Sequence, residues 1–254
     1  MSRRVDLRGV LRAAAALVAG AAIVRLIDGF LGSIPAAGAV LGAFAVDLVA
    51  GRVGVRWSEE GKPPWARDLR LGATRGASAA LVVVLVGIIA GWASVALGSP
   101  GPTLAFALAR VFGESCRDVM LLIGIPITLG LRARVPASFL VAFAAAAAAA
   151  PLSLAEHADP AAIASAAAMA ALGARLLLAT RGVTAATAAH AAWLLALGPL
   201  SRGGLLDVVW RVGDPGPPPH AEGAIAWVGV AVVTAVAIFG VPGMPRQDDA
   251  PLKM

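Results

Sequence analysis

Charged residues are scarce in this sequence: Asp, Glu, Lys and Arg make up 14% of its 254 residues, whereas 59% are hydrophobic. An ordinary water-soluble domain carries about 25% charged residues, so this balance excludes that class. The chain has one cysteine, Cys116, which excludes an internal disulfide and a cysteine-rich metal site. The mean hydropathy is +0.83. These absences leave a chain whose main solvent is lipid.

Long apolar runs dominate what remains, and they predict an all-α, polytopic transmembrane helical bundle. A bilayer core about 30 Å thick needs about 20 apolar residues per helix. The runs are rich in Ala, Leu and Val and lack the period-two alternation of barrel strands. We therefore expect one integral membrane domain over residues 1–254, with the first run retained as a span. Eight spans are predicted, at residues 10–31, 34–51, 76–97, 103–131, 136–152, 160–180, 183–198 and 223–241.

Positive charge alternates between the predicted loops. Arginines and lysines cluster before the first span, in residues 52–75, around residues 132–134, at Arg181 and after the last span, whereas residues 98–102 carry no charge. Loops rich in Lys and Arg tend to remain cytoplasmic. We expect both termini to be cytoplasmic in a bacterial inner membrane, with lipids as partners. The net charge of +6 is spread over these loops and forms no basic face for nucleic acid.

Ionisable residues within the spans are the candidates for chemistry, because burying them in lipid is costly. Glu114 lies eleven residues into the fourth predicted span, roughly 16 Å from its outer end at about 1.5 Å per residue. Arg110 and Arg117 lie four residues before and three after it, so either guanidinium can pair with its carboxylate. Asp118 follows and can share a cation. A purely structural ion pair is the competing interpretation of Glu114.

Two of the three histidines lie in the same half of the predicted bundle as Glu114. His190 is roughly 12 Å inside the seventh span, and His157 follows the fifth span, where the helix can continue past Pro151 with a kink. His220 follows a proline-rich segment and is expected in a solvated loop. A carboxylate with two imidazoles suits metal binding or general-base activation of water, and spacing alone does not separate the two. We predict no metal and no cofactor.

The order and spacing of Glu114, His157 and His190 resemble the CAAX-protease and bacteriocin-processing family of glutamic intramembrane proteases. Residues 113–117 (Gly-Glu-Ser-Cys-Arg) stand where that family has paired glutamates followed by an arginine, with one glutamate missing and the arginine at least one residue early. Residues 153–157 end in a histidine but have Ser in place of the usual Phe. Residues 190–193 (His-Ala-Ala-Trp) match closely, and Leu194 then replaces the usual Asn. The likeness covers residues 103–241.

The resemblance implies an intramembrane endopeptidase that cleaves membrane-anchored proteins or peptides. Glu114 would activate a water, while His157 and His190 would place the water and stabilise the oxyanion. Arg117 and Asp118 would support this site. The resemblance also points to the myxosortase-like group, whose substrates are cut near an anchoring helix.

Two other functions compete with the protease. The missing second glutamate, Phe and Asn favour a noncatalytic membrane scaffold or binding protein derived from the same family. A transporter would require polar sites at the midplane of both halves of a repeat. The first half offers Arg25, Asp28 and Asp47, but we find no internal repeat to support a transporter.

Overall fold

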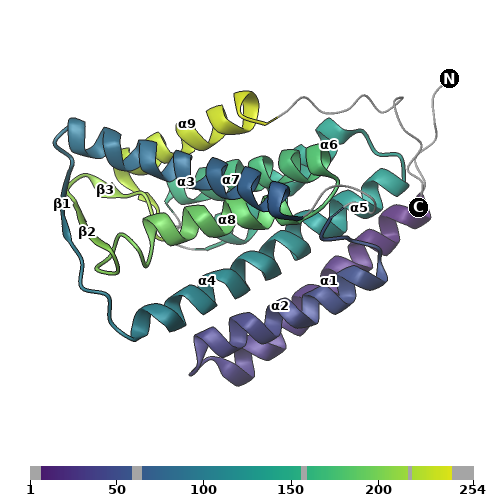
Figure 1. The fold of residues 1–254 in the computed structure, drawn as a ribbon. Coiled ribbons are helices and arrows are strands. Elements are labelled where there is room, and N and C mark those ends of the chain that lie inside the picture. The colour runs from purple at the N-terminus through teal and green to yellow at the C-terminus, as the bar shows by residue number, and fades with distance from the viewer. Residues whose placement is uncertain (1–6, 59–64, 156–158, 217–218, 242–254) are drawn as a thin grey trace.

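The computed structural model describes residues 7–58, 65–155, 159–216 and 219–241. In these ranges the chain forms a bundle of helices with a short two-stranded ribbon at one end (Figure 1). The helices are α1 (Leu7–Leu31), α2 (Pro35–Arg52), α3 (Trp65–Ile89), α4 (Thr103–Val119), α5 (Ile125–Arg132), α6 (Ala137–Ser153), α7 (Pro160–Thr180), α8 (Thr184–Leu197) and α9 (Gly223–Phe239), with a π-helical turn, η1 (Met120–Gly124), between α4 and α5. The strands are β1 (Ala93–Leu97), β2 (Leu206–Trp210) and the short β3 (Gly213–Asp214).

The predicted helical character is confirmed, but the prediction of eight spans is not. Among the described residues, four helices are long and apolar enough to cross a membrane: residues 14–31 of α1, and all of α2, α3 and α7. Helices α6, α8 and α9 are apolar but have only 14 to 17 residues. At about 1.5 Å per residue, 17 residues extend about 25 Å, which is less than the roughly 30 Å of a bilayer core.

The third predicted span is wrong at both ends. Helix α3 begins at Trp65, eleven residues before the predicted start, and ends at Ile89. Gly91 then adopts a positive φ of +72° that turns the chain out of the helix. Residues 93–97, predicted as the end of a span, form strand β1, which pairs antiparallel with β2 and sets Val95 opposite Val208. Apolar β-branched residues suit a strand as well as a buried helix, and the partner strand lies far along the sequence.

The predicted span over residues 103–131 consists of α4, the π turn η1 and α5 in one continuous helical run. Pro126 explains the irregular turn, because proline has no backbone N–H to donate to the carbonyl one turn earlier. A π turn absorbs such an interruption without ending the helix, and such turns are frequent at functional sites. This one directly follows the charged segment from Glu114 to Asp118.

Helix α7 begins where the sequence supplies a cap. The Asp159 carboxylate accepts a hydrogen bond of 2.7 Å from the backbone N–H of Ala161, and Pro160 occupies the first helical position. The preceding helix, α6, continues past Pro151 and ends at Ser153, as the sequence analysis allowed.

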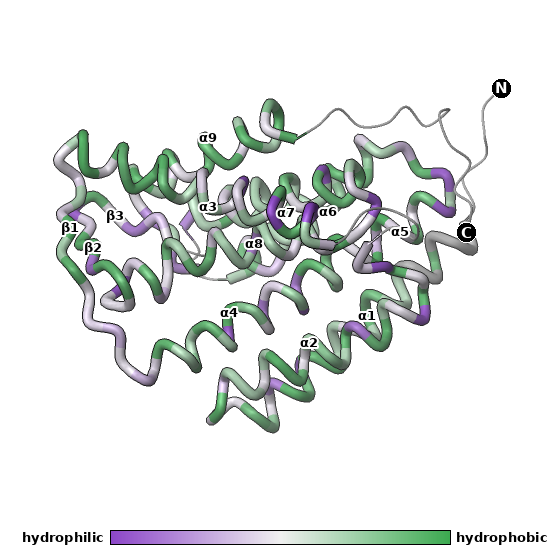
Figure 2. The backbone as a smooth tube through the Cα atoms, viewed as in Figure 1, coloured by the Kyte–Doolittle hydropathy of each residue, from purple (hydrophilic) through white to green (hydrophobic). Residues whose placement is uncertain are grey.

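The interior of the bundle lies around α7 and α8, whereas α1 and α2 lie on the outside. Helix α8 packs against α3, α4 and α7, and two thirds of α7 is buried. By contrast, large apolar side chains point outwards on the peripheral helices: Phe30 of α1 is 84% exposed and Phe239 of α9 is 85% exposed. Figure 2 shows hydrophobic residues along the length of these helices. Apolar surface of this extent is typical of a lipid-facing protein.

Loops that were predicted to be cytoplasmic contact one another at one end of the bundle, and the loop of residues 98–102, predicted on the other side of the membrane, lies at the opposite end. At one end the Arg132 guanidinium donates to the carbonyl of Val53 at 2.8 Å, and the N–H of Val183 donates to the carbonyl of Arg56 at 3.1 Å. At the other end the N–H of Ser99 donates to the carbonyl of Gly203 at 3.0 Å. Strands β1 and β2 lie at this second end (Figure 1).

Candidate functional site

Helices α4 and α8 pack side by side in opposite directions (Figure 1). Their register is fixed where Gly124 meets Val183: a Cβ on Gly124 would lie 3.2 Å from a methyl group of Val183. Seven residues from that contact, about 10 Å along each helix, lie Arg117 on the first helix and His190 on the second. The charged segment of α4 and His190 therefore lie at the same depth in the bundle.

The structure places the predicted glutamate and one of the predicted histidines on two helices that pack together, Glu114 on α4 and His190 on α8. Asp118 lies on α4 as well. Glu114 and Asp118 are four residues apart on α4, so they lie on one helix face one turn apart. The Nδ1 atom of His190 is buried and has no hydrogen-bond partner among the described residues.

Each of the two carboxylates also has an arginine partner on its own helix. The Arg110 Nε donates to Glu114 Oε1 at 2.7 Å, and Arg117 Nε donates to Asp118 Oδ1 at 2.8 Å. Arg110 is 53% exposed, whereas Arg117 is only 17% exposed. From the sequence, either arginine could pair with Glu114, and in the structure Arg110 forms this ion pair.

Arg117 also links α4 to the first two helices. Its Nη1 lies 3.6 Å from Oδ1 of Asp28 on α1, and its side chain passes over Gly42 of α2, where an added Cβ would lie 3.3 Å from the arginine Cδ. Gly113 permits the same close approach, because its Cβ would lie 2.6 Å from the backbone of Ala39. Gly113 and Arg117 therefore mark the face of α4 that packs against α1 and α2.

Ser115 lies on the opposite face of α4. It is two residues from Gly113, which is about 200° around a helix, and it is 0% exposed. Helix α8 covers this face. The hydroxyl oxygens of Ser115 and of Thr187 on α8 are both buried and lack a hydrogen-bond partner among the described residues. The sequence analysis missed both hydroxyls; the available signal was that Thr187 lies three residues before His190, on the same helix face.

Of the other two histidines, the structure describes only His220. His157 lies outside the described residues, so its predicted convergence with Glu114 stays a prediction. His220 is exposed just before α9, consistent with the loop position predicted for it. Within the described ranges, no group of three or more His, Cys, Asp or Glu side chains is arranged to hold a metal ion.

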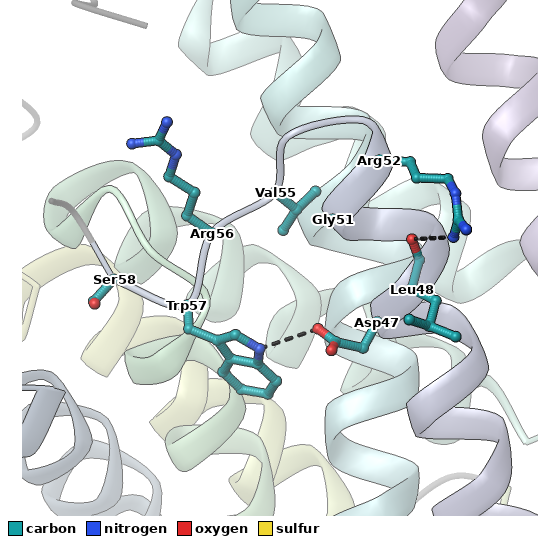
Figure 3. Close-up of a pocket in the computed structure, with 8 residues that line it drawn as sticks. All are labelled: Asp47, Leu48, Gly51, Arg52, Val55, Arg56, Trp57 and Ser58. Carbon is teal, nitrogen blue, oxygen red and sulfur yellow. Dashed lines mark hydrogen bonds between the residues drawn. The ribbon is translucent and has the colours of Figure 1, made fainter.

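Asp47, which the sequence left unexplained, lines an open pocket of about 750 Å³ at the end of α2 (Figure 3). The indole of Trp57 points at Asp47 and donates to its carboxylate at 3.0 Å. The carbonyl of Trp57 in turn accepts hydrogen bonds from the backbone N–H and the hydroxyl of Thr184, at 3.1 and 2.6 Å. Asp47 thus fixes the segment that satisfies the free N–H groups at the start of α8. Its contacts are explained by this structural role.

Comparison of the chain with models of known protein families, with curated protein sequences and with solved structures finds no match in any of the three.

Proposed function

We propose that the chain is an intramembrane endopeptidase of the glutamic type, acting on membrane-anchored protein or peptide substrates. One observation supports the proposal most: Glu114 and Asp118 on α4 lie at the same depth as His190 on the neighbouring helix α8, whose Nδ1 atom is buried. Ionisable groups in such a setting are costly, and they are typically retained for a function. The resemblance of the motifs around Glu114 and His190 to the CAAX-protease and bacteriocin-processing family points to the same chemistry.

Glu114 is the proposed general base. The Arg110 Nε donates to the Glu114 carboxylate at 2.7 Å and holds it in place, and in the proposed scheme the carboxylate accepts a proton from water. The resulting hydroxide attacks the carbonyl carbon of the peptide bond, and the proton on Glu114 passes to the departing amine. An N–H group of His190 stabilises the oxyanion, a role whose loss typically lowers the rate by about a hundredfold or more. His157, in the segment between α6 and α7, is the proposed second imidazole.

Arg117 and Asp118 are proposed as supporting residues. Arg117 joins Asp118 to Asp28, so it holds α4 in place against α1 and α2. Asp118 accepts a hydrogen bond from Arg117 and lies one turn from Glu114, so its proposed role is to hold the Arg117 side chain in place beside the site. Neither residue needs to contact the substrate in this scheme.

The proposed topology places both termini in the cytoplasm of a bacterial inner membrane. The contacts that gather the loops around Arg56, Arg132 and Arg181 at one end of the bundle support it, while Arg202 and Arg211 lie at the other end. Helix α8, with 14 residues, extends about 21 Å and does not reach both surfaces by itself. Because α3, α4 and α7 enclose it, we propose that it lies within the membrane domain without contacting lipid along its length. The same ordering of helices would give eight passes, several of them shorter than a full span.

A noncatalytic membrane scaffold is the alternative. The ion pairs of Glu114 with Arg110 and of Asp118 with Arg117 favour it, because they satisfy both carboxylates without a substrate. In that case the charged segment of α4 would serve only to fix the packing of α1, α2 and α4.

Cleavage in native membranes separates the two functions. We expect cells that express the parent chain to accumulate fragments of membrane-anchored proteins that are missing in cells expressing Glu114→Gln, as measured by mass spectrometry of new peptide ends. Glu222→Gln is the matched control, because Glu222 is exposed before α9 and remote from α4 in the sequence. Identical fragments with parent and Glu114→Gln at equal expression would contradict the proposal and favour the scaffold.

A further inference from the structure

Three polar atoms without partners lie between α4 and α8. They are Ser115 Oγ, Thr187 Oγ1 and His190 Nδ1, each buried and each lacking a hydrogen-bond partner within the part of the chain that the structure describes. Ser115 is 0% exposed and Thr187 is 7% exposed. Thr187 belongs to neither the motifs nor the proposed catalytic groups, and Ser115 lies within the motif of residues 113–117 but has no role in the proposed chemistry.

Helix geometry places Thr187 and His190 on one face of α8. They are three residues apart, and Val183, four residues before Thr187, touches Gly124 just beyond α4. The face towards α3 is a different one, because an added Cβ on Gly72 or Gly76 of α3 would collide with Ala185 or Ala189. The face that carries Thr187 and His190 is therefore turned to the helical run of α4.

Ser115 reaches the same interface from the other side. Its face of α4 is opposite the face packed on α2. Ser115 lies nine residues along α4 from the contact between Gly124 and Val183, whereas His190 lies seven residues along α8 from the same contact. The three polar groups thus follow one another along the interface in the order Thr187, His190, Ser115. We call this set of three residues the polar seam.

An unpaired buried hydroxyl or ring nitrogen is expensive. Each costs about 1–3 kcal/mol if it stays unsatisfied, so three of them would weigh heavily against a net stability of about 5–15 kcal/mol. Buried polar groups that have no protein partner usually bind internal water, and such a water needs two to four polar neighbours. The polar seam offers donors and acceptors of this kind inside an apolar bundle.

We propose that the polar seam binds ordered waters, held by the hydroxyls of Ser115 and Thr187 on either side of His190, one of which donates a hydrogen bond to His190 Nδ1. The ring proton of neutral His190 then resides on Nε2. The proposed hydration of the seam rests only on the packing of α4 against α8 and does not depend on the proposed function. Its use as the source of the attacking water, with Ser115 and Thr187 as positioning residues, rests on the proposed function.

Solid-state NMR of the full chain in lipid vesicles tests the hydration directly. In a His157→Gln/His220→Gln background, His190 is the only histidine, so ring-labelled histidine reports on it alone. We expect magnetisation to pass rapidly from water to the His190 ring, with the ring nitrogen shifts of the Nε2-protonated form. A ring that receives no more magnetisation than the surrounding alanine methyl groups would overturn the proposal.

Hydroxyl removal tests which residues hold the water. Ser115→Ala combined with Thr187→Val should abolish the fast transfer, and restoring Ser115 with Thr187→Ser should recover it. Thr180→Val is the matched control, because the Thr180 hydroxyl already donates to the carbonyl of Leu176 at 2.8 Å. An unchanged transfer in the folded double variant would contradict the proposed roles of both hydroxyls.

Failure of this proposal can be told apart from failure of the protease proposal. The NMR measurement contains no peptide substrate, and we expect Glu114→Gln to keep the water signal while it loses cleavage. A hydrated ring in a chain without peptidase activity would leave the seam established and the protease refuted. A dry ring in an active chain would refute the seam alone.

Discussion

Replacing Gly76 with alanine should separate α3 from α8 and disturb the site from a distance. Gly72 and Gly76 form a Gly-x-x-x-Gly pattern, a spacing that lets two membrane helices approach closely. A Cβ on Gly76 would lie 2.1 Å from the carbonyl oxygen of Ala189, whereas real Cβ contacts essentially never fall below 3.0 Å. The difference of 0.9 Å must be taken up by backbone movement, because the neighbour is itself backbone.

The expected losses of stability and of activity follow from that displacement of the backbone. Overpacking of a close contact typically costs about 1–3 kcal/mol, which for a chain of this length lowers the melting temperature by about 2–4 °C per kcal/mol. Ala189 immediately precedes His190, so the same shift moves the imidazole relative to α4. A misplacement of about 1 Å can lower a catalytic rate by about a hundredfold. We therefore expect activity to fall further than stability does.

Tryptophan fluorescence during heating in detergent micelles measures the stability effect, since Trp193 is 1% exposed and lies beside Gly229 of α9. Gly29→Ala is the control, because nothing lies within 4 Å of a Cβ at that position. A melting temperature for Gly76→Ala equal to that of Gly29→Ala would refute the packing argument. Loss of stability without any change at His190 would refute the coupling to the site.

Three further predictions concern topology, the ion pairs and the imidazole. In a Cys116→Ser background, a membrane-impermeant maleimide should label Ser99→Cys only from outside the cell and Ser138→Cys only from inside; labelling of both from one side would contradict the proposed orientation. Arg117→Met should lower the free energy of unfolding by about 1–3 kcal/mol, because Asp28 and Asp118 lose their shared cation, and should do so more than Arg202→Met, because the Arg202 side chain is more exposed than that of Arg117. His190→Gln should reduce cleavage by about a hundredfold or more while His220→Gln does not, and equal activity of the two variants would exclude an oxyanion role.

The positions of the helices could be predicted from the sequence because apolar runs of this length have few alternatives. All eight predicted runs contain a helix in the structure. Their exact ends could not be predicted where polar residues continue a helix: the first turns of α3 carry Arg67 and Asp68, which suggested a loop. The β1–β2 ribbon was missed because the whole stretch from α4 to α8 separates its two strands in the sequence, and no local pattern indicates so distant a partner.

Motif spacing singled out Glu114 and His190, which lie on the packed helices α4 and α8, but the sequence did not indicate which residues surround them. Asp28 was considered among the polar residues of the first half, whereas in the structure its Oδ1 lies 3.6 Å from Nη1 of Arg117 on α4. The contact depends on Gly42 and Gly113, which bring α2 and α4 close enough, and glycine alone does not reveal which helix approaches it. Ser115 and Thr187 were missed for a similar reason, since only packing shows that their hydroxyls are buried.

Cleavage in water enriched in ¹⁸O tests the central claim most directly. The proposed mechanism adds an oxygen from water to the carbonyl carbon of the cleaved bond, so each new carboxyl terminus should carry the heavy isotope. Vesicles containing the purified parent chain and membrane-anchored candidate substrates should yield such termini, whereas Glu114→Gln should yield none and Glu222→Gln should match the parent. Labelled termini in equal amounts from Glu114→Gln and the parent would contradict a Glu114-activated water.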